Sequence, residues 1–368
     1  MSEDFIHKAP PRRGFVIPVE FYTMEGVFLP RSNGVCDSFM AENYDFLGIG
    51  DIVTDAFIQL KDPSAHIDID HEVREICMRF ADKIPYESVT VIQAVGNSAN
   101  ATVAAARLGL RSALVANVGG DHYGSESIEA LAKEHVGAEF VRVHQGEKTN
   151  YNFVLWYDND RTILVKYEAY PYELPDIGEP AWVYLSSLGA NSFEFHQVIE
   201  RYLVERPNIK LAFQPGTFQI KMTKELEGIY RRADVFFCNK EEAQRILESS
   251  EEDIKKLTQM LHAKGPKIVS ISDGPKGAYA SDGTSMWSMR TYPDPKPPYE
   301  RTGAGDAFSG TFTAALALGK SVPEALQWGP INSMSVVQQI GARAGLLTRS
   351  QLEEYLAKAP EDYKPQLL

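Results

Sequence analysis

The chain has 368 residues, of which 44% are hydrophobic, and this is enough to bury one large α/β core or the cores of two domains. Its formal net charge is −13. Nucleic acids and anionic membrane surfaces attract basic patches, so this charge argues against both as partners. It does not argue against a nucleotide, because a few local donors and a metal ion are sufficient to bind one.

Cysteine usage and the first residues bear on the cellular compartment. Cys36, Cys77 and Cys238 are widely spaced and odd in number, which is typical of reduced thiols rather than of a disulfide framework or a zinc site. Residues 1–14 mix charges with a Pro-Pro pair, so we expect no signal peptide. No uninterrupted apolar run reaches membrane-spanning length. The sequence predicts a cytoplasmic protein without a membrane anchor.

The chain divides into an extension and a body. Residues 1–43 carry Pro, Gly, mixed charge and a few aromatics, and we interpret them as an extended N-terminal arm. The body, residues 44–368, starts with an apolar strand at 44–50. A helix at 101–108 and a second strand at 113–118 come next.

Further apolar runs alternate with helical patterns. Strands are predicted at 183–188, 209–214, 235–238 and 268–271, and helices between them at 192–205 and 241–247. Apolar runs joined by helices are typical of a doubly wound, mostly parallel sheet flanked by helices. Ligands bind beyond the carboxyl ends of the strands of such sheets. The polar segments that fall there are 117–121, 214–217, Asn239 and 272–277.

Three segments break the alternation of strand and helix, near 52–68, 88–94 and 149–167. They are β-rich or apolar at every second residue. The clearest case is a hairpin, with strands at 151–157 and 162–167 joined by a turn at Asp158-Asn159-Asp160. We interpret these segments as a small β-sheet lid that projects from the main sheet.

The most informative motif is Thr302-Gly303-Ala304-Gly305-Asp306, which precedes an apolar helix at 307–318. Small residues let backbone N–H groups converge on an anion, and the positive end of the helix dipole adds to the attraction. A carboxylate beside such an anion hole suits a base that activates a hydroxyl for attack on a phosphoryl group. The alternative is that Asp306 merely caps the helix.

A second pair of oxygen ligands lies at the start of the helix at 241–247. Asn239 and Glu242 are three residues apart, so both side chains lie on one helix face. Hard oxygen ligands suit magnesium and its waters, and we expect the pair to organise that ion. The alternative is a capping box between the two residues.

Two more sets of residues are candidate ligand contacts. Ser272, Gly274 and Gly277 lie in a turn after a buried strand, where a backbone can approach a nucleotide closely, although an ordinary turn would look the same. Carboxylates and amides grip vicinal hydroxyls in pairs, and the candidates for an acceptor site are Asp51, Asp55, Gly96, Asn97 and Asn100. For Asp51, a turn residue is the alternative.

Five segments, in order, resemble the signature motifs of the PfkB (ribokinase-like) family of sugar and nucleoside kinases. They are 95–109, 117–124, 239–242, 272–277 and 302–310. The resemblance implies a ribokinase-like fold and ATP-dependent phosphorylation of a primary hydroxymethyl group of a sugar or nucleoside, with Mg²⁺. It gives Asp306 the role of general base, and Gly303, Ala304 and Gly305 that of anion hole. It places Asp55, Gly96 and Asn100 on the sugar, and Thr302, Asn239 and Asn332 near the nucleotide.

The sequence also departs from the family pattern. Glu300 stands where the family usually has Asp, two places before the signature Thr, and Arg301 follows it. Because this neighbourhood often binds a monovalent cation in the family, we expect weak potassium dependence. The paired glycines of the N-terminal signature are reduced to Val95-Gly96.

Two other functions are weighed against a sugar kinase. One is a nucleoside (adenosine-type) kinase, and the other is a catalytically weak relative that only binds a metabolite. The retained Asp306, Gly303, Gly305, Asn239 and Glu242 argue against the weak relative. A dinucleotide-binding dehydrogenase is excluded, because the first strand is not followed by a GxGxxG turn.

The lid hairpin suggests an oligomeric state. Its two strands carry large apolar side chains on both faces, and only one face can cover the acceptor. An exposed apolar face usually marks an interface. We expect a homodimer through the lid, with residues 1–43 as a competing cover for the same surface.

Overall fold

The computed structural model describes residues 43–61, 65–70, 73–157 and 160–368. Apart from Asn43, the expected N-terminal arm lies outside the described residues, as does the hairpin turn Asp158-Asn159. Among the described residues, no helix combines the length and the apolar character needed to cross a membrane.

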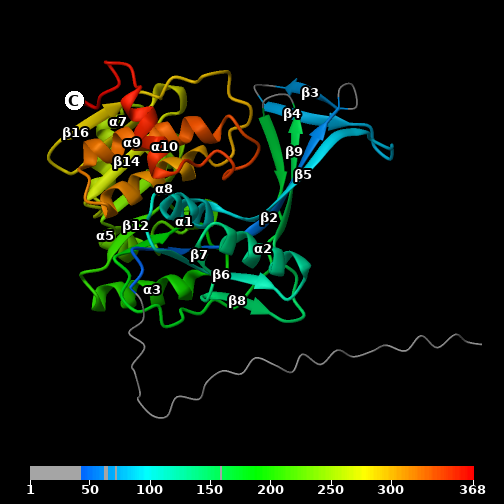
Figure 1. Ribbon diagram of the computed structural model, residues 1–368, viewed down its shortest axis with the longest axis horizontal. Helices are drawn as coiled ribbons and strands as arrows, with labels where there is room; N and C mark the ends of the chain where they lie inside the picture. Colours follow the sequence, from blue (N-terminus) through cyan, green and yellow to red (C-terminus); the bar gives the residue numbers. More distant parts are fainter. Residues whose placement is uncertain (1–42, 62–64, 71–72, 158–159) are drawn as a thin grey trace, which may run out of the picture. The chain divides into compact units, whose positions relative to one another are not determined.

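The central element is an eleven-stranded sheet with the order β17-β16-β15-β14-β13-β12-β11-β1-β6-β7, in which β8 also pairs with β6 (Figure 1). The pairs from β14 across to β7 are parallel, and β15, β16 and β17 add an antiparallel edge. The strands are β1 (Phe46–Ile49), β6 (Ser112–Gly119), β7 (Val136–Gly137), β8 (Val141–His144), β11 (Trp182–Leu185), β12 (Lys210–Phe213), β13 (Val235–Asn239), β14 (Ile268–Ser272), β15 (Ala278–Ser281), β16 (Met286–Met289) and β17 (Gln366–Leu367).

Helices cover both faces of this sheet (Figure 1). They are α1 (Asn97–Arg107), α2 (His122–Lys133), α3 (Phe193–Glu205), α4 (Thr217–Lys221), α5 (Glu227–Arg232), α6 (Lys240–Leu247), α7 (Ile254–His262), α8 (Ala304–Ala317), α9 (Val322–Val336) and α10 (Arg349–Ala357), with a single 3₁₀ turn at Gly274–Lys276. One core cluster joins α1, α8, α9 and α10 to the sheet, and another joins α3, α5, α6 and α7 to it.

Successive side chains of a strand point to opposite faces of the sheet, which explains why the sheet has one core on each face. In β1, Phe46 belongs to the α1/α8 cluster and Leu47 to the α3/α5 cluster, and both are fully buried. The doubly wound parallel sheet predicted from the apolar runs is therefore confirmed. One boundary differs, because α8 starts at Ala304 rather than at residue 307. Gly305 and Asp306 consequently lie inside the first turn of that helix.

A separate four-stranded sheet forms the lid, with the order β10-β9-β2-β5 (Figure 1). Its strands are β2 (Val53–Leu60), β5 (Tyr86–Val95), β9 (Tyr151–Tyr157) and β10 (Asp160–Leu164), and the hairpin of β3 (Ala65–Asp70) and β4 (Val73–Met78) forms a third sheet. The predicted β9–β10 hairpin is present, although β10 ends at Leu164. Parallel pairing of β2 with β9 aligns Asp55 with Asn152, two residues far apart in the chain.

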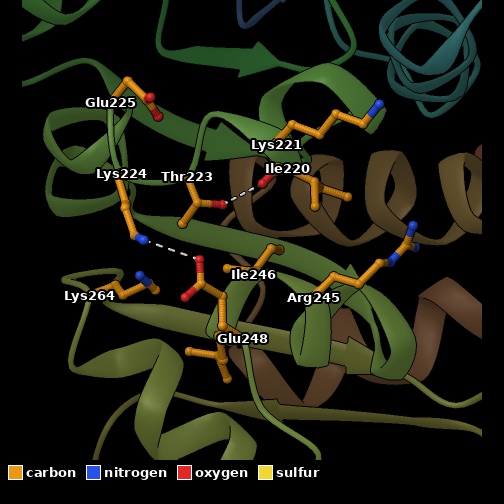
Figure 2. A pocket seen from close by; sticks show the side chains of 10 residues that line it. Ile220, Lys221, Thr223, Lys224, Glu225, Arg245, Ile246, Glu248 and Lys264 are labelled. Carbon is orange, nitrogen blue, oxygen red and sulfur yellow. Dashed lines mark hydrogen bonds and ion pairs between the residues drawn. The ribbon is translucent and has the colours of Figure 1, made fainter.

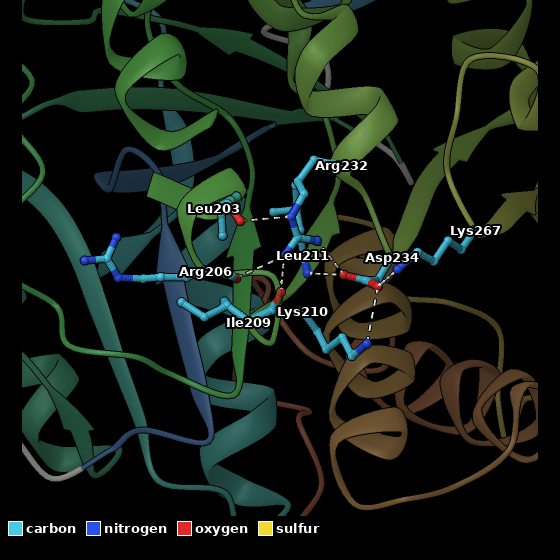
Figure 3. Close-up of polar contacts among 8 residues, drawn as sticks. All are labelled: Leu203, Arg206, Ile209, Lys210, Leu211, Arg232, Asp234 and Lys267. Carbon is cyan, nitrogen blue, oxygen red and sulfur yellow. Dashed lines mark hydrogen bonds and ion pairs between the residues drawn. The ribbon is translucent and has the colours of Figure 1, made fainter. Parts of the chain in front are cut away.

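A buried carboxylate ties the strands together at their amino ends (Figure 3). Asp234, just before β13, accepts the backbone N–H of Leu211 at 2.9 Å and pairs with Arg232 at 3.0 Å and Lys267 at 2.8 Å. Burial would raise the pKa of Asp234, but the hydrogen bond from Lys267 and the nearby cations outweigh it and lower the pKa. This cluster supports β12, β13 and β14 at the edge opposite to their carboxyl ends.

Candidate active site

Asp306 is the centre of a buried polar cluster in the first turn of α8. Its Oδ1 accepts hydrogen bonds from Asn97 Nδ2 at 2.8 Å and Gln214 Nε2 at 3.3 Å, and its Oδ2 accepts one from Asn100 Nδ2 at 2.8 Å. Asn97 and Asn100 lie three apart at the start of α1, whereas Gln214 directly follows β12. Two elements far apart in sequence therefore orient one carboxylate, and the amides that sequence analysis assigned to the acceptor contact the carboxylate itself.

The environment of Asp306 changes its acidity. The side chain is only 8% exposed. Burial raises the pKa of Asp306, and the amide hydrogen bonds from Asn100, Gln214 and Asn97 oppose that rise. The balance yields a carboxylate that is more basic than an exposed aspartate, which suits a group that accepts a proton.

The turn before Asp306 packs its backbone closely against a neighbouring segment. Gly303 has φ +80°, and a Cβ there would lie 2.2 Å from the Cβ of Ala342. Gly303 is the N-cap of α8, so the N–H groups of residues 303–306 precede the first i to i−4 bond of the helix, Ala307 N–H to Gly303 O at 2.8 Å. Ala304 N–H has a long contact of 3.5 Å with Arg301 O. These donors lie where the sequence predicts an anion hole.

The residues before the turn link it to the lid. The Glu300 side chain is 2% exposed, and its Oε1 accepts the Thr302 N–H at 2.7 Å and the Thr302 hydroxyl. Arg161 Nε of β10 lies 3.6 Å from the same oxygen. Arg301, in contrast, is exposed. The cation beside Glu300 is therefore the lid arginine rather than the neighbour in sequence.

Asn239 and Glu242 form the capping box that was the alternative to a metal site. Asn239 Oδ1 accepts the Glu242 N–H at 2.7 Å, and Glu242 Oε2 accepts the Asn239 N–H at 2.9 Å. Burial raises the pKa of Glu242, and the charge of Asp306 adds to the rise. The start of α6 thus lies close enough to Asp306 for the two carboxylates to repel each other. A cation bound nearby would stabilise the ionised form of Glu242.

The nucleotide candidates differ in their surroundings. Gly274 has φ +49° and a Cβ there would have nothing within 4 Å, whereas a Cβ on Gly277 would lie 2.1 Å from the Met289 carbonyl oxygen. Gly277 is therefore required by packing against β16. Asn332 is fully buried, donates to Thr311 Oγ1 at 2.7 Å and accepts the Leu347 N–H at 2.9 Å. Because both ends of its amide are used inside the core, we leave Asn332 out of the nucleotide site.

The acceptor candidates include buried oxygens without hydrogen-bond partners. Asp51 Oδ2 accepts the Tyr172 hydroxyl at 2.7 Å, while Asp51 Oδ1 and Asn100 Oδ1 have no hydrogen-bond partner among the described residues. Asp55 Oδ1 accepts Asn152 Nδ2 at 3.1 Å. Burial raises the pKa of Asp51 and of Asp55 to about 6. Buried acceptors of this kind favour a ligand that brings donors, such as hydroxyl groups.

Gly96 positions these groups. It has φ +134°, and a Cβ there would lie 2.5 Å from the Asp51 carbonyl oxygen. The start of α1 is thereby held against the end of β1, next to Asp51. The reduced signature Val95-Gly96 retains the one glycine that this contact needs.

Sequence reasoning missed Gln214, Asn152 and Arg161 as site residues. Gln214 had a signal, because it is the last residue of the strand predicted at 209–214, at the edge of the sheet where ligands bind. Asn152 and Arg161 reach the site through the pairing of β2 with β9 and of β9 with β10. Nothing in the local sequence encodes that pairing.

A cavity of about 220 Å³ lies between α4 and α6, away from these residues (Figure 2). Its walls include a Lys224–Glu248 ion pair of 3.2 Å. The remaining lining residues are Ile220, Lys221, Thr223, Glu225, Arg245, Ile246, Leu247 and Lys264. Because no predicted site residue lines this cavity, we do not assign it to the reaction.

Comparisons with known proteins agree with the fold and the motifs. The sequence matches the pfkB family carbohydrate kinase model over residues 64–349. It is 24% identical over 273 residues to the ribokinase of Haemophilus influenzae, covering 72% of this chain and 87% of that one. It is 26% identical over 258 residues to the nucleoside kinase of Methanothermobacter thermautotrophicus, covering 68% and 80%.

Solved structures show the same architecture. Arabidopsis thaliana ribokinase complexed with ribose and ATP has a TM-score of 0.70 at 19% identity, over 85% of this chain and 99% of that one. The nucleoside kinase of Methanocaldococcus jannaschii has a TM-score of 0.70 at 18% identity, over 86% and 99%. With a family match over most of its length and the family's motifs gathered around Asp306, the chain belongs to the pfkB family of carbohydrate kinases.

Proposed function

We propose that the protein transfers the γ-phosphoryl group of ATP to a primary hydroxymethyl group, with a sugar of the ribokinase type as the favoured acceptor. The observation that carries the proposal is the buried Asp306 carboxylate, which three amides hold in the first turn of α8 next to the N–H groups of residues 303–305. A base next to converging N–H groups is the arrangement that phosphoryl transfer to an alcohol requires.

In this mechanism, Asp306 takes the proton of the acceptor hydroxyl while its oxygen attacks the γ-phosphorus. A new O–P bond forms, and the bond between the γ-phosphorus and the bridging oxygen breaks and leaves ADP. The N–H groups of Gly303, Ala304 and Gly305 hold the phosphoryl oxygens, and Thr302 and the turn at Ser272–Gly274 border the nucleotide.

The acceptor side suits a neutral, hydroxyl-rich molecule. Asp51, Asp55 and Asn100 present buried oxygens that accept hydrogen bonds, and two of these oxygens have no partner among the described residues. Carboxylates that face the acceptor repel a phosphorylated one. We therefore propose a free sugar before a sugar phosphate.

A nucleoside is the second candidate acceptor, and one observation favours it. Burial raises the pKa of Tyr167, and the charges of Asp51 and Asp55 raise it further, so this ring lies close to both carboxylates. Tyr167 also meets the ring of Phe218 edge to face, with centroids 6.0 Å apart. An aromatic wall beside the acceptor carboxylates can stack on a base.

An acceptor panel tests the proposal directly. ADP formation is measured with Mg²⁺ and ATP for ribose, fructose, fructose 6-phosphate, adenosine and cytidine. We expect turnover of a free sugar, and turnover of a nucleoside alone would favour the second candidate. Binding of acceptors in a thermal-shift assay without any ADP formation would support the catalytically weak relative instead.

Magnesium fits the oxygen ligands at the start of α6. Asn239 and Glu242 would hold the ion's hydration shell, since the capping box uses only one oxygen of the Glu242 carboxylate. When bound with ATP, the ion neutralises the charge of the phosphate groups.

Glu242→Gln is expected to raise the magnesium concentration needed for half-maximal rate more than it changes acceptor affinity. Glutamine retains the capping box, so the substitution isolates the carboxylate charge. The neighbouring exposed Glu241→Gln is the control, with a magnesium titration as the measurement. Identical titrations for both variants would mean that Glu242 is only part of a helix cap.

A weak response to potassium is expected, because Arg161 already supplies a positive charge 3.6 Å from the buried Glu300. The rate is compared in NaCl and KCl at constant ionic strength. In Arg161→Met, the uncompensated carboxylate should favour a bound cation, and a potassium effect should appear. A strong potassium activation of the unmodified enzyme would contradict this expectation.

The outer face of the lid supports a homodimer. Pairing across its four strands aligns Val91, Ala56, Phe153 and Leu164 in one row. In this row Val91 is 40%, Phe153 45% and Leu164 52% exposed, while Ala56 between them is buried, as are Val154 and Trp156 on the other face. An apolar row of this kind suits a second lid.

We expect light scattering to give a dimer for the full chain. The same measurement is made on a chain that starts at Glu42 and on the variant Phe153→Lys. Of these two, Phe153→Lys should be monomeric. Monomers in the full and shortened chains would eliminate the lid-to-lid dimer. Dimerisation only after shortening would identify residues 1–43 as the cover.

The expected cytoplasmic location stays a prediction from the cysteines.

A further inference from the structure

Beside the amide oxygen of Gln214 lies a pair of buried hydroxyl groups. Tyr184 on β11 is fully buried and Ser309 on α8 is 1% exposed, and their oxygens are 2.7 Å apart. The Tyr184 hydroxyl donates to Gln214 Oε1, and Ser309 Oγ lies 3.0 Å from the same oxygen and 2.8 Å from the Gly305 carbonyl oxygen, two acceptors that share its single proton. The amide nitrogen of Gln214 is thereby left to face Asp306 Oδ1 at 3.3 Å.

The Tyr184 hydroxyl is not explained by packing. The ring lies in the apolar core, where it stacks on Phe46 with centroids 5.5 Å apart, and a phenylalanine would fill the same space. A buried hydroxyl costs free energy unless it is hydrogen-bonded, and the partners of this one are Gln214 and Ser309. Its role is therefore to be sought in the side chain of Gln214.

We propose that Tyr184 and Ser309 are positioning residues, which fix the orientation of the Gln214 amide so that Gln214 holds Asp306 as a proton acceptor. This inference rests on the proposed function, in which Asp306 is the base. It adds a second layer of residues behind that base, drawn from β11 and α8.

The orientation of the amide matters because a carboxylate only accepts hydrogen bonds. With its nitrogen toward Asp306, Gln214 stabilises the ionised form. With the amide reversed, its oxygen would lie against the carboxylate oxygen and favour the protonated form. Donation by the Tyr184 hydroxyl to Oε1, with Ser309 Oγ 3.0 Å from the same oxygen, favours the first orientation.

The groups that face Asp306 come from four elements. Asn97 and Asn100 on α1 and Gln214 after β12 donate to it. Tyr184 on β11 and Glu242 on α6 interact with its charge. Burial raises the pKa of Tyr184 well above its usual value, and the charge of Asp306 adds to this, so Tyr184 remains a donor at neutral pH.

The test measures the titration of Asp306 itself, by NMR of the protein labelled with ¹³C at the aspartate carboxyls, with Asp306→Asn to assign the signal. Gln214→Met, and Tyr184→Phe combined with Ser309→Ala, should each move the midpoint upward by about one pH unit, a tenfold change in proton affinity. The acid limb of kcat against pH should move in the same direction.

Ser186→Ala is the matched control. The Ser186 hydroxyl is fully buried and donates to the backbone carbonyl of Gln214 at 2.8 Å, so it supports the same residue without touching its amide. This variant should melt at a lower temperature and leave the Asp306 titration unchanged.

Two outcomes separate this inference from the proposed function. An unchanged Asp306 midpoint in both Gln214→Met and the double variant would overturn the positioning role. A shifted midpoint with an unchanged kcat profile would retain the positioning role and remove Asp306 as the base. Because the NMR titration needs no acceptor, an unidentified substrate does not affect it.

Discussion

Asp306→Asn is expected to reduce kcat by about 10² to 10⁴, the usual contribution of a general base. The substitution preserves shape but removes the proton acceptor. It also places an amide nitrogen against one of the three amide donors that now face the carboxylate, from Asn97, Asn100 and Gln214. We therefore expect a loss of about 1 to 3 kcal/mol in stability, the usual cost of a mismatched buried polar group.

The measurement combines turnover with calorimetric binding of an unreactive ATP analogue. Binding of the analogue should be retained, because Asp306 does not contact the adenine side. Asp282→Asn, in an exposed surface turn, makes the same chemical change away from the site and should leave both unchanged. Turnover at the rate of the unmodified enzyme in Asp306→Asn would refute the mechanism.

The main sheet was accessible from sequence because its strands are buried on both faces. β1 and β11 are apolar at every position but one, and this leaves little ambiguity between strand and loop. The motif at 302–306 was also readable, since the glycines and the aspartate are adjacent. Local patterns thus predicted a candidate site and the carboxylate at its centre.

The contacts inside the site could not be predicted, because they join segments that are distant in sequence. Asn97 and Asn100 were assigned to the acceptor, yet their amide nitrogens hold Asp306 more than 200 positions away. Asn332 matched the family pattern by position, but its amide is used in the core. A motif fixes residue types, whereas the partner of each amide depends on how helices and strands pack.

The proposed anion hole depends on a backbone conformation and a packing contact, and substitutions can separate the two. Gly303 at the start of α8 has φ +80°, and Gly319, just beyond its end, has φ +79°. A Cβ on Gly303 would lie 2.2 Å from Ala342 Cβ and 2.5 Å from Ala342 Cα, whereas a Cβ on Gly319 would have nothing within 4 Å. The two glycines share a backbone conformation and differ in packing.

Gly319→Ala is therefore expected to cost about 1 to 2 kcal/mol, the price of a left-handed alanine, with normal turnover. Gly303→Ala adds a clash with the backbone at Ala342, for a total of about 2 to 5 kcal/mol. Relief of that clash moves the N–H groups at the start of α8, and loss of one such donor lowers kcat by about 10² to 10³.

Urea unfolding of the two variants gives the free energies, and turnover at a temperature where both remain folded gives the rates. The comparison distinguishes strain from the loss of the anion hole, since both variants carry the same strained alanine. If Gly303→Ala and Gly319→Ala had equal turnover, the N–H groups of residues 303–305 would not hold the phosphoryl group. If Gly303→Ala alone lost turnover, the close packing of Gly303 on Ala342 would be the feature that shapes the anion hole.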